Sequence, residues 1–160
     1  MVRPVLRYPD PVLKRACEPV SLERGLALAE DLVDTMRAHP GCVGLAAPQV
    51  GEPLRVAVVD VSGHRLATSC GGLVVLVNPT LVESAGLKIA REGCLSLPAI
   101  TADVARAKRV LVGAAGRADP LWAEGFEARA IQHELDHLDG ILILDRVAGV
   151  HAIFKRQAAG

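Results

Sequence analysis

The stretch FEARAIQHELDHL, residues 126–138, decides the fold of this chain. Its apolar residues recur at helical spacing, and the pair Asp139-Gly140 directly after it is a typical stop signal, so the stretch predicts a helix. On a wheel at about 100° per residue, side chains suited to a protein interior occupy two roughly opposite sectors. A helix buried on two faces should run through the middle of its domain.

The faces of this helix carry different chemistry. One sector holds Phe126, Ala130, His133 and His137, the opposite one holds Ala128, Ile131, Leu135 and Leu138, and a polar stripe holds Arg129, Gln132, Asp136 and Asp139. We expect the polar stripe to face solvent. Glu134 lies outside that stripe, beside the histidines, where an unpaired buried carboxylate is costly.

His133, Glu134 and His137 form the pattern His-Glu-x-x-His. Two histidines at i and i+4 lie on one helical face and can bind one metal ion, while the glutamate can act as general base. The alternative is structural: both histidines are ordinary polar residues of a core helix, and Glu134 forms a salt bridge.

A catalytic metal site needs three protein ligands and an open position. Outside the helix the candidates are three histidines, four cysteines and the carboxylates. Cys94 is notable because it lies in EGCLSLP, residues 92–98, a turn-like break between two predicted strands. A free cysteine is more often a small buried hydrophobe, so the residues alone leave the third ligand open.

The remaining elements indicate an α+β fold. Ser21 is a plausible N-cap for a helix through Ala38, which His39-Pro40-Gly41 ends. Because strands are grouped between helices rather than alternating with them, an α/β arrangement is disfavoured. The predicted strands are residues 54–61, 73–78, 87–90 and 104–112, and a short final helix is predicted over 145–157.

Composition excludes several functions. The chain has 160 residues, enough for one domain, and its formal net charge is zero with 22% charged residues. Such a chain offers no broad phosphate-neutralising surface, and its four aromatic residues of the Trp, Tyr and Phe types provide few base-stacking platforms. We therefore expect no direct nucleic-acid binding.

The chain shows no sign of secretion or membrane insertion. Its N-terminus does not resemble a signal peptide, and its longest apolar run, Leu73 to Val77, is far too short to span a bilayer. The four cysteines are scattered, so free thiols are expected: Cys17, Cys42, Cys70 and Cys94. We expect a cytoplasmic protein.

Three separate motifs make the sequence resemble the bacterial peptide deformylases. These are GLAAPQ at residues 44–49, EGCLS at 92–96 and QHELDHL at 132–138, in the order and with the spacing typical of that family. The opening YPDPVL, residues 8–13, is also similar. The resemblance implies one catalytic domain over residues 1–160, with antiparallel β-sheets packed around the central His-Glu-x-x-His helix. It also implies removal of the formyl group from N-formylmethionyl peptides and nascent chains.

The resemblance implies a role for each motif residue. Cys94, His133 and His137 would bind the metal, which would be Fe2+ in the cell and Zn2+ or Ni2+ in some preparations. Glu134 would act as general base and then acid, and the Gln49 amide and the Leu95 backbone N–H would bind the oxyanion. The residues implied at the substrate are Val43, Gly44, Ala90, Glu92, Phe126 and Ala130.

Several supporting residues have alternative interpretations. Gln49 taken alone could be a turn residue after Pro48. Glu92 and Arg106 are expected to form a buried pair that orients the cysteine loop, rather than two surface charges. Asp136 could support a metal ligand or face solvent.

The sequence departs from the family pattern at three places. Cys42 replaces the first glycine of a Gly-x-Gly pattern and adds an oxidisable thiol near the site. Residues 113–124 form a shorter stretch that lacks the usual hairpin signal, so we expect a trimmed sheet edge. The chain ends soon after Arg156, and because a longer C-terminal helix assists ribosome contact in some relatives, that partner is weakly indicated here.

Two other functions remain open. A zinc endopeptidase with the same helix motif would need a downstream third ligand, which could only be His151 or a carboxylate such as Asp145. A structural metal site would need a fourth protein ligand and no room for water. In that case the glutamate beside the metal would have no purpose.

Overall fold

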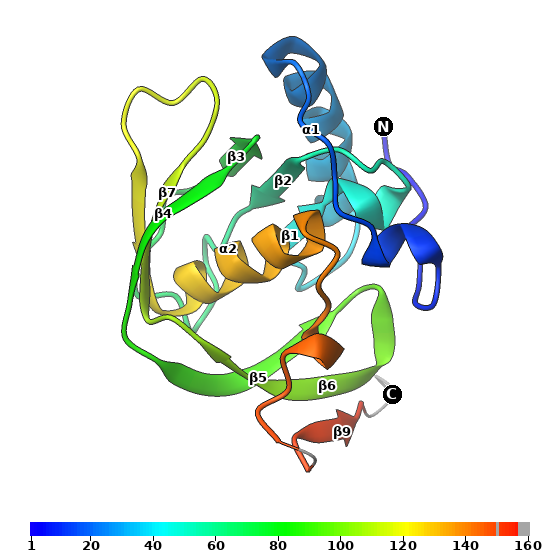
Figure 1. The fold of residues 1–160 in the computed structure, drawn as a ribbon, viewed down its shortest axis with the longest axis vertical. Helices are drawn as coiled ribbons and strands as arrows, with labels where there is room; N and C mark the ends of the chain where they lie inside the picture. Colours follow the sequence, from blue (N-terminus) through cyan, green and yellow to red (C-terminus); the bar gives the residue numbers. More distant parts are fainter. Residues whose placement is uncertain (150, 157–160) are drawn as a thin grey trace.

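A helix runs through the middle of the molecule, and three small sheets surround it (Figure 1). The computed structural model describes residues 1–149 and 151–156. The central helix, α2, spans Gly125–Leu138, which matches the predicted helix within one residue. The α+β class predicted from the sequence is confirmed, since every strand pairing within the three sheets is antiparallel.

The first sheet separates α2 from the N-terminal helix. It has the order β1-β2-β3, with β1 at Gly44–Ala46, β2 at Val56–Val59 and β3 at Val74–Val77. Both helices contact β1 and β2. The observed β2 and β3 are shorter than the predicted strands, since their pairing covers Val56–Val59 and Val74–Val77.

The N-terminal helix α1, Leu22–Arg37, begins where the sequence predicts. The Ser21 hydroxyl accepts a hydrogen bond from the backbone N–H of Arg24 at 3.3 Å, as an N-cap does. Its apolar face packs on the first sheet, in a cluster that includes Leu28, Leu32, Met36, Val56 and Val58. A second cluster places α2 against the sheets through Ala128, Ile131, Val59, Val110 and Val112.

The second sheet has the order β4-β7-β8 and lies along the start of α2. Its strands are β4 at Thr80–Ala85, β7 at Arg109–Gly113 and β8 at Leu121–Glu124. Strands β4 and β8 were not predicted. Although residues 113–124 lack the usual hairpin signal, β7 and β8 pair over four residues each and lead directly into α2.

The third sheet has the order β5-β6-β9 and carries the cysteine motif. Strand β5 spans Lys88–Cys94 and β6 spans Leu97–Arg106, and their register shifts between Gly93 and Cys94. The predicted strand over residues 104–112 was therefore wrong as a single element. It divides into the end of β6 and the start of β7, separated by a turn at Ala107-Lys108.

The predicted C-terminal helix over residues 145–157 is wrong. In the described part of this stretch the structure has a 3-10 turn, η3 at Ile143–Asp145, and then a strand, β9 at Ile153–Lys155, while Val150 and Gln157 lie outside the described residues. Strand β9 pairs with the open edge of β6, and the Arg91 guanidinium lies 3.5 Å from the centre of the Phe154 ring. Pairing with an available edge outweighs a weak local preference for helix.

Short 3-10 turns at Pro11–Lys14 (η1) and Ala47–Val50 (η2) complete the fold. Gly140 ends α2 with φ +73°, and a Cβ there would lie 2.5 Å from the backbone oxygen of Lys14. A glycine is therefore required where the end of the central helix meets the N-terminal segment. No helix in the described part of the chain is both long and apolar enough to cross a bilayer.

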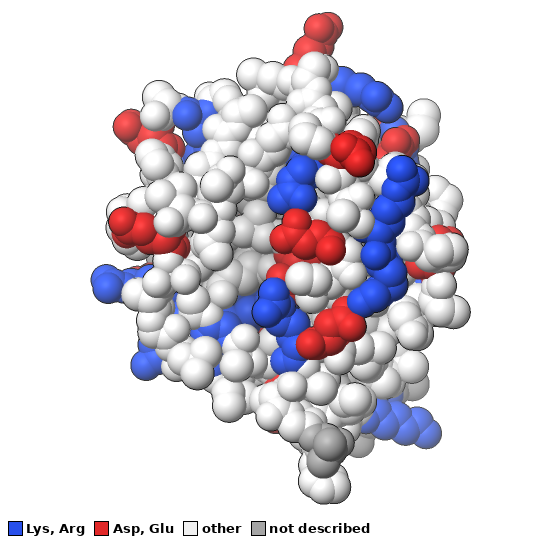
Figure 2. All heavy atoms as spheres, viewed as in Figure 1, with Lys and Arg blue, Asp and Glu red and all other residues white. Residues whose placement is uncertain are grey.

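The surface carries charged side chains of both signs. On the face shown in Figure 2, positive and negative side chains are interspersed rather than gathered by sign. All four cysteines are free, as expected: Cys17, Cys42, Cys70 and Cys94.

Candidate active site

Three potential metal ligands from two distant parts of the chain meet beside α2. Cys94 ends β5, and His133 and His137 lie one turn apart on α2. Their ligand atoms all lie within 4.8 Å of one another, and all three residues are buried. Cys94 Sγ lies 3.4 Å from His137 Nε2. One thiolate and two imidazoles fit a divalent zinc or iron ion, and a set of three leaves a position open.

Glu92 fixes the orientation of His133. Its Oε1 lies 2.9 Å from His133 Nδ1, which leaves Nε2 for a metal. The expected buried pair with Arg106 is confirmed, since Arg106 donates two hydrogen bonds to Glu92 at 2.9 and 3.0 Å. Burial by itself raises the pKa of Glu92, but the hydrogen bonds with His133 and Arg106 outweigh it and hold that pKa well below its usual value. Glu92 is therefore a fixed anion.

Part of the polar stripe of α2 is buried rather than exposed to solvent. Arg129 is only 7% exposed and Asp136 only 8%. Arg129 donates to Glu92 at 2.6 Å and to two backbone carbonyls, and Asp136 accepts hydrogen bonds from Arg106 and Arg146. The prediction of solvent exposure was wrong for Arg129, and of the two alternatives left open for Asp136 the solvent-facing one does not hold, because neighbouring charged residues and backbone carbonyls supply partners for both.

Glu134 lies on α2 directly after His133, with little space around its carboxylate. Its side chain is buried, and Oε1 has no hydrogen-bond partner among the described residues. A Cβ on Gly44 would lie 2.6 Å from Glu134 Oε2, so β1 passes directly against the carboxylate. Burial raises the pKa of Glu134 to about 7. A carboxylate with such a pKa can both accept and return a proton near neutral pH.

Gln49 has its amide fixed in one orientation. Its Oε1 accepts the backbone N–H of Ala46 at 3.1 Å, so the Nε2 end must point the other way. That nitrogen donates to Ser96 Oγ at 3.1 Å and lies 3.6 Å from Cys94 Sγ. Gln49 is therefore both a residue of the 3-10 turn η2 and a hydrogen-bond donor to the cysteine motif. Ser96, which is fully buried, was not singled out from the sequence.

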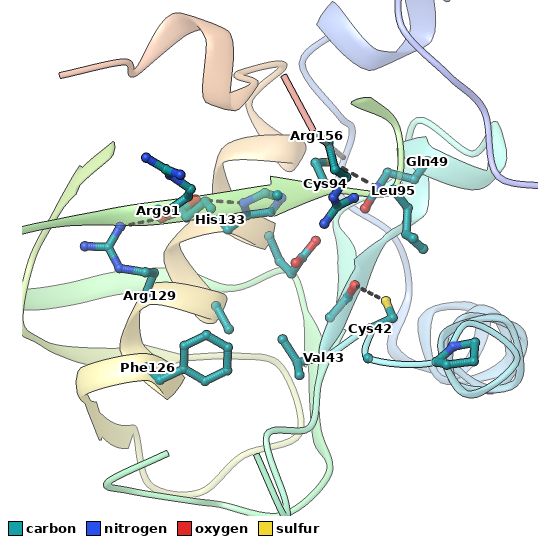
Figure 3. Close-up of a pocket in the computed structure, with 17 residues that line it drawn as sticks. Cys42, Val43, Gln49, Arg91, Cys94, Leu95, Phe126, Arg129, His133 and Arg156 are labelled. Atoms are coloured by element: carbon teal, nitrogen blue, oxygen red, sulfur yellow. Dashed lines mark hydrogen bonds and ion pairs between the residues drawn. The ribbon is translucent and has the colours of Figure 1, made fainter. Parts of the chain in front are cut away.

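A cavity of about 500 Å³ opens beside these residues (Figure 3). Most residues expected at the substrate line it, namely Val43, Gly44, Glu92, Phe126 and Ala130, together with Leu95. Ala90 does not belong to the described lining, since it lies earlier on β5. Sequence reasoning missed three arginines of the lining: Arg91, Arg129 and Arg156. No motif marks them, although Arg91 lies next to the cysteine motif.

Cys42 also lines the cavity. Its thiol donates to the backbone oxygen of Gly44 at 3.1 Å, and burial raises its pKa to about 11. Cys42 is therefore held as a neutral thiol against β1, and it is not part of the metal-ligating group.

The ligands required by the endopeptidase alternative lie elsewhere. Asp145 forms an ion pair with Lys14 and accepts the Leu142 backbone N–H at 2.9 Å. His151 is exposed and lines a separate, smaller cavity. Neither residue belongs to the group formed by Cys94 and the two helix histidines.

A buried ligand set, an adjacent carboxylate and an open cavity are together the parts of a metal-dependent hydrolase. Comparison with known proteins identifies which one. The family model described as polypeptide deformylase matches residues 2–152. A peptide deformylase of Dictyoglomus thermophilum is 43% identical over 91% of this chain and 93% of its own length. The chain belongs to the polypeptide deformylase family, whose metal-dependent members remove the N-formyl group from nascent polypeptides.

Solved structures agree with this assignment. A peptide deformylase from Legionella pneumophila superposes with a TM-score of 0.81 at 38% identity, covering 94% of this chain and 88% of the other. A class I type b peptide deformylase from Acinetobacter baumannii, solved with Met-Ala-Ser bound, gives 0.81 at 35% identity, covering 92% and 99%.

Proposed function

We propose that this chain is a single catalytic domain in which Cys94, His133 and His137 bind the metal and Glu134 transfers the proton during deformylation. The observation that carries the proposal is the convergence of three ligand atoms within 4.8 Å of one another, beside a cavity that Cys94, His133 and Glu134 line. A structural metal site is disfavoured, because that group holds three ligands and opens to a cavity rather than closing with a fourth.

The chain's own residues account for the steps around the formyl carbon. A bound divalent metal would supply Lewis-acid polarisation and make water more acidic. Glu134 takes the proton from the attacking water and later gives it to the departing amine, which leaves formate and a free N-terminus. Gln49 Nε2 and the Leu95 N–H donate hydrogen bonds to the developing oxyanion, and removing one such donor typically costs about 10²–10³ in turnover.

The cavity walls suit the methionine of the substrate. Val43, Phe126 and Ala130 provide apolar surface, and the His64 ring stacks on Phe126 with centroids 4.1 Å apart. The related enzyme from Acinetobacter baumannii was solved with Met-Ala-Ser, the peptide that deformylation would release from formyl-Met-Ala-Ser. We propose that Gly44 and Glu92 lie along the bound peptide at the floor of the cavity.

The test is formate release from formyl-Met-Ala-Ser by metal-loaded protein, with Glu134→Ala measured in parallel. Rapid release by the wild type, abolished in the variant at unchanged metal content, is the expected result. If the metal-loaded wild type releases no formate from any formyl peptide, the proposed function is wrong.

We propose Fe2+ as the metal in the cell. A thiolate with two imidazoles accepts iron, zinc or nickel, so ligand type alone does not choose among them. An Fe(II)–thiolate site is open to oxidation, so iron-loaded protein should lose activity in air while a nickel-loaded sample keeps it. Full activity of the iron form after prolonged aeration would contradict this assignment.

The cellular setting follows from the substrate. Nascent formylmethionyl chains emerge in the bacterial cytoplasm, so we propose that the enzyme acts there. Contact with the ribosome stays a prediction from the family resemblance.

A further inference from the structure

The rim of the cavity carries positive charge that the proposed mechanism does not use. Three arginines belong to the lining, but their charges are not equally available. Arg129 is 7% exposed and is neutralised by Glu92 at 2.6 Å. Arg91 and Arg156 remain at the mouth.

Arg156 reaches the cavity because of the C-terminal strand. Its backbone N–H donates to the oxygen of Ala99 at 2.8 Å, which extends the pairing of β9 with β6. Its Nη2 lies 2.6 Å from the position that a Cβ on Gly93 would occupy. The guanidinium therefore lies against the backbone of the residue next to Cys94, and Figure 3 shows it beside Cys94 and Leu95.

The guanidinium of Arg156 is not neutralised by a carboxylate in the described part of the chain. Its side chain is exposed and forms no ion pair with any of the described residues. Arg91 is only partly engaged, since its Nε lies 3.3 Å from Asp103 and its side chain is 52% exposed. The same guanidinium stacks on Phe154, two residues before Arg156, and so links β5 to β9 across β6.

We propose that Arg156, supported by Arg91, makes this enzyme favour formyl-methionyl peptides with a carboxylate side chain at the second or third residue. This proposal rests on the proposed deformylase function and adds the substrate class. With the formyl group beside Cys94 and the methionine side chain against the apolar wall, the next residues must leave through the rim. A guanidinium there can donate two parallel hydrogen bonds to a carboxylate, and it repels an ammonium.

The preference should be modest and should appear mainly in KM. Both arginines are solvent-accessible, and exposed ion pairs contribute little, so we expect about fivefold between glutamate and lysine substrates. The ion pair between the arginine and the substrate carboxylate would form on binding and persist in the transition state. Because it stabilises both states equally, it lowers KM and leaves kcat unchanged. Rising salt concentration should reduce the preference.

The experiment compares kcat and KM for formyl-Met-Ala-Xaa and formyl-Met-Xaa-Ala amides in which Xaa is Glu, Gln or Lys. The amidated ends remove the terminal carboxylate, so only the side chain differs in charge. Wild-type enzyme should prefer Glu over Gln over Lys at one of the two positions. Arg156→Gln should bring the three KM values together, and Arg156→Lys should keep part of the preference. Arg117→Gln, an exposed arginine outside the cavity lining, is the matched control.

Three results would overturn the proposal. Equal KM values for the Glu and Lys peptides at both positions in the wild type would show that the rim does not select. A uniform gain in turnover on all peptides with Arg156→Gln would show that the guanidinium obstructs the cavity instead. If metal-loaded enzyme cleaves no formyl peptide, the proposed function itself fails. If the wild-type enzyme deformylates peptides but shows no charge preference, only this inference fails.

Discussion

Replacing Gly44 by alanine tests whether catalysis depends on the position of Glu134. The added Cβ would lie 2.6 Å from Glu134 Oε2 and 3.1 Å from its Cδ, where ordinary contact begins at 3.4 Å. The backbone itself accepts alanine, since φ of Gly44 is not in the left-handed region. Glu134 is only 4% exposed and lies on a buried helix, so its carboxylate has to shift within the cavity.

The required shift is most of an ångström. A displacement of that size in a reacting group typically costs about 10² in rate, so kcat of Gly44→Ala should fall by roughly that factor. The three atoms nearest to the new methyl group all belong to Glu134 and not to a metal ligand, so metal content should stay at the wild-type level. Formate release and metal analysis on the same preparation measure both quantities.

Two comparisons separate this effect from loss of folding. Gly113→Ala adds a Cβ whose nearest contact is at 3.7 Å, so it should have near wild-type activity. In a Glu134→Ala background, Gly44→Ala should cause no further loss, because the group it displaces is gone. Near wild-type turnover of Gly44→Ala, or an equal loss with and without Glu134, would refute the reasoning.

Three more predictions test other parts of the structure. Glu92→Gln should weaken metal affinity about 10–100-fold, because it loosens a metal-binding histidine, and should destabilise the fold by about 3–5 kcal/mol, because it leaves buried arginines underpaired. Metal titration and denaturant unfolding measure the two effects, and unchanged values would contradict the role given to Glu92. Gly140→Ala should lower the free energy of unfolding by about 1–3 kcal/mol, since its Cβ would meet the backbone of Lys14; wild-type stability in the same unfolding assay would refute this. Iodoacetamide at pH 7.5 should label exposed Cys70 well before Cys17, whose pKa burial raises to about 11; equal labelling rates by mass spectrometry would show that Cys17 is accessible.

Local patterns predicted the helices α1 and α2. The Ser21 cap, the stop at Gly140 and the spacing of His133 and His137 each depend on residues within a turn or two of one another. Local preferences were weaker elsewhere. The C-terminal helix was wrong because the edge of β6 was available to pair with Ile153–Lys155, and no local pattern reports an open edge.

The charges around the site could not be read from a helical wheel. The wheel placed Arg129 and Asp136 on a polar stripe, and both are polar, but the structure buries them among Glu92, Arg106 and Arg146. A wheel describes one helix without its neighbours. Only the packing of β5 and β6 beside α2 provides partners that make burial of these charges possible.

The sequence by itself determined the central helix, the pair of histidines with their adjacent glutamate, and the α+β class, because helical spacing and strand grouping are properties of neighbouring residues. Tertiary structure alone decided that Cys94 meets those histidines, that the Gln49 amide points toward it, and that Arg156 comes to the cavity rim. Each of these depends on the register of paired strands, which is set by contacts between residues far apart in the chain.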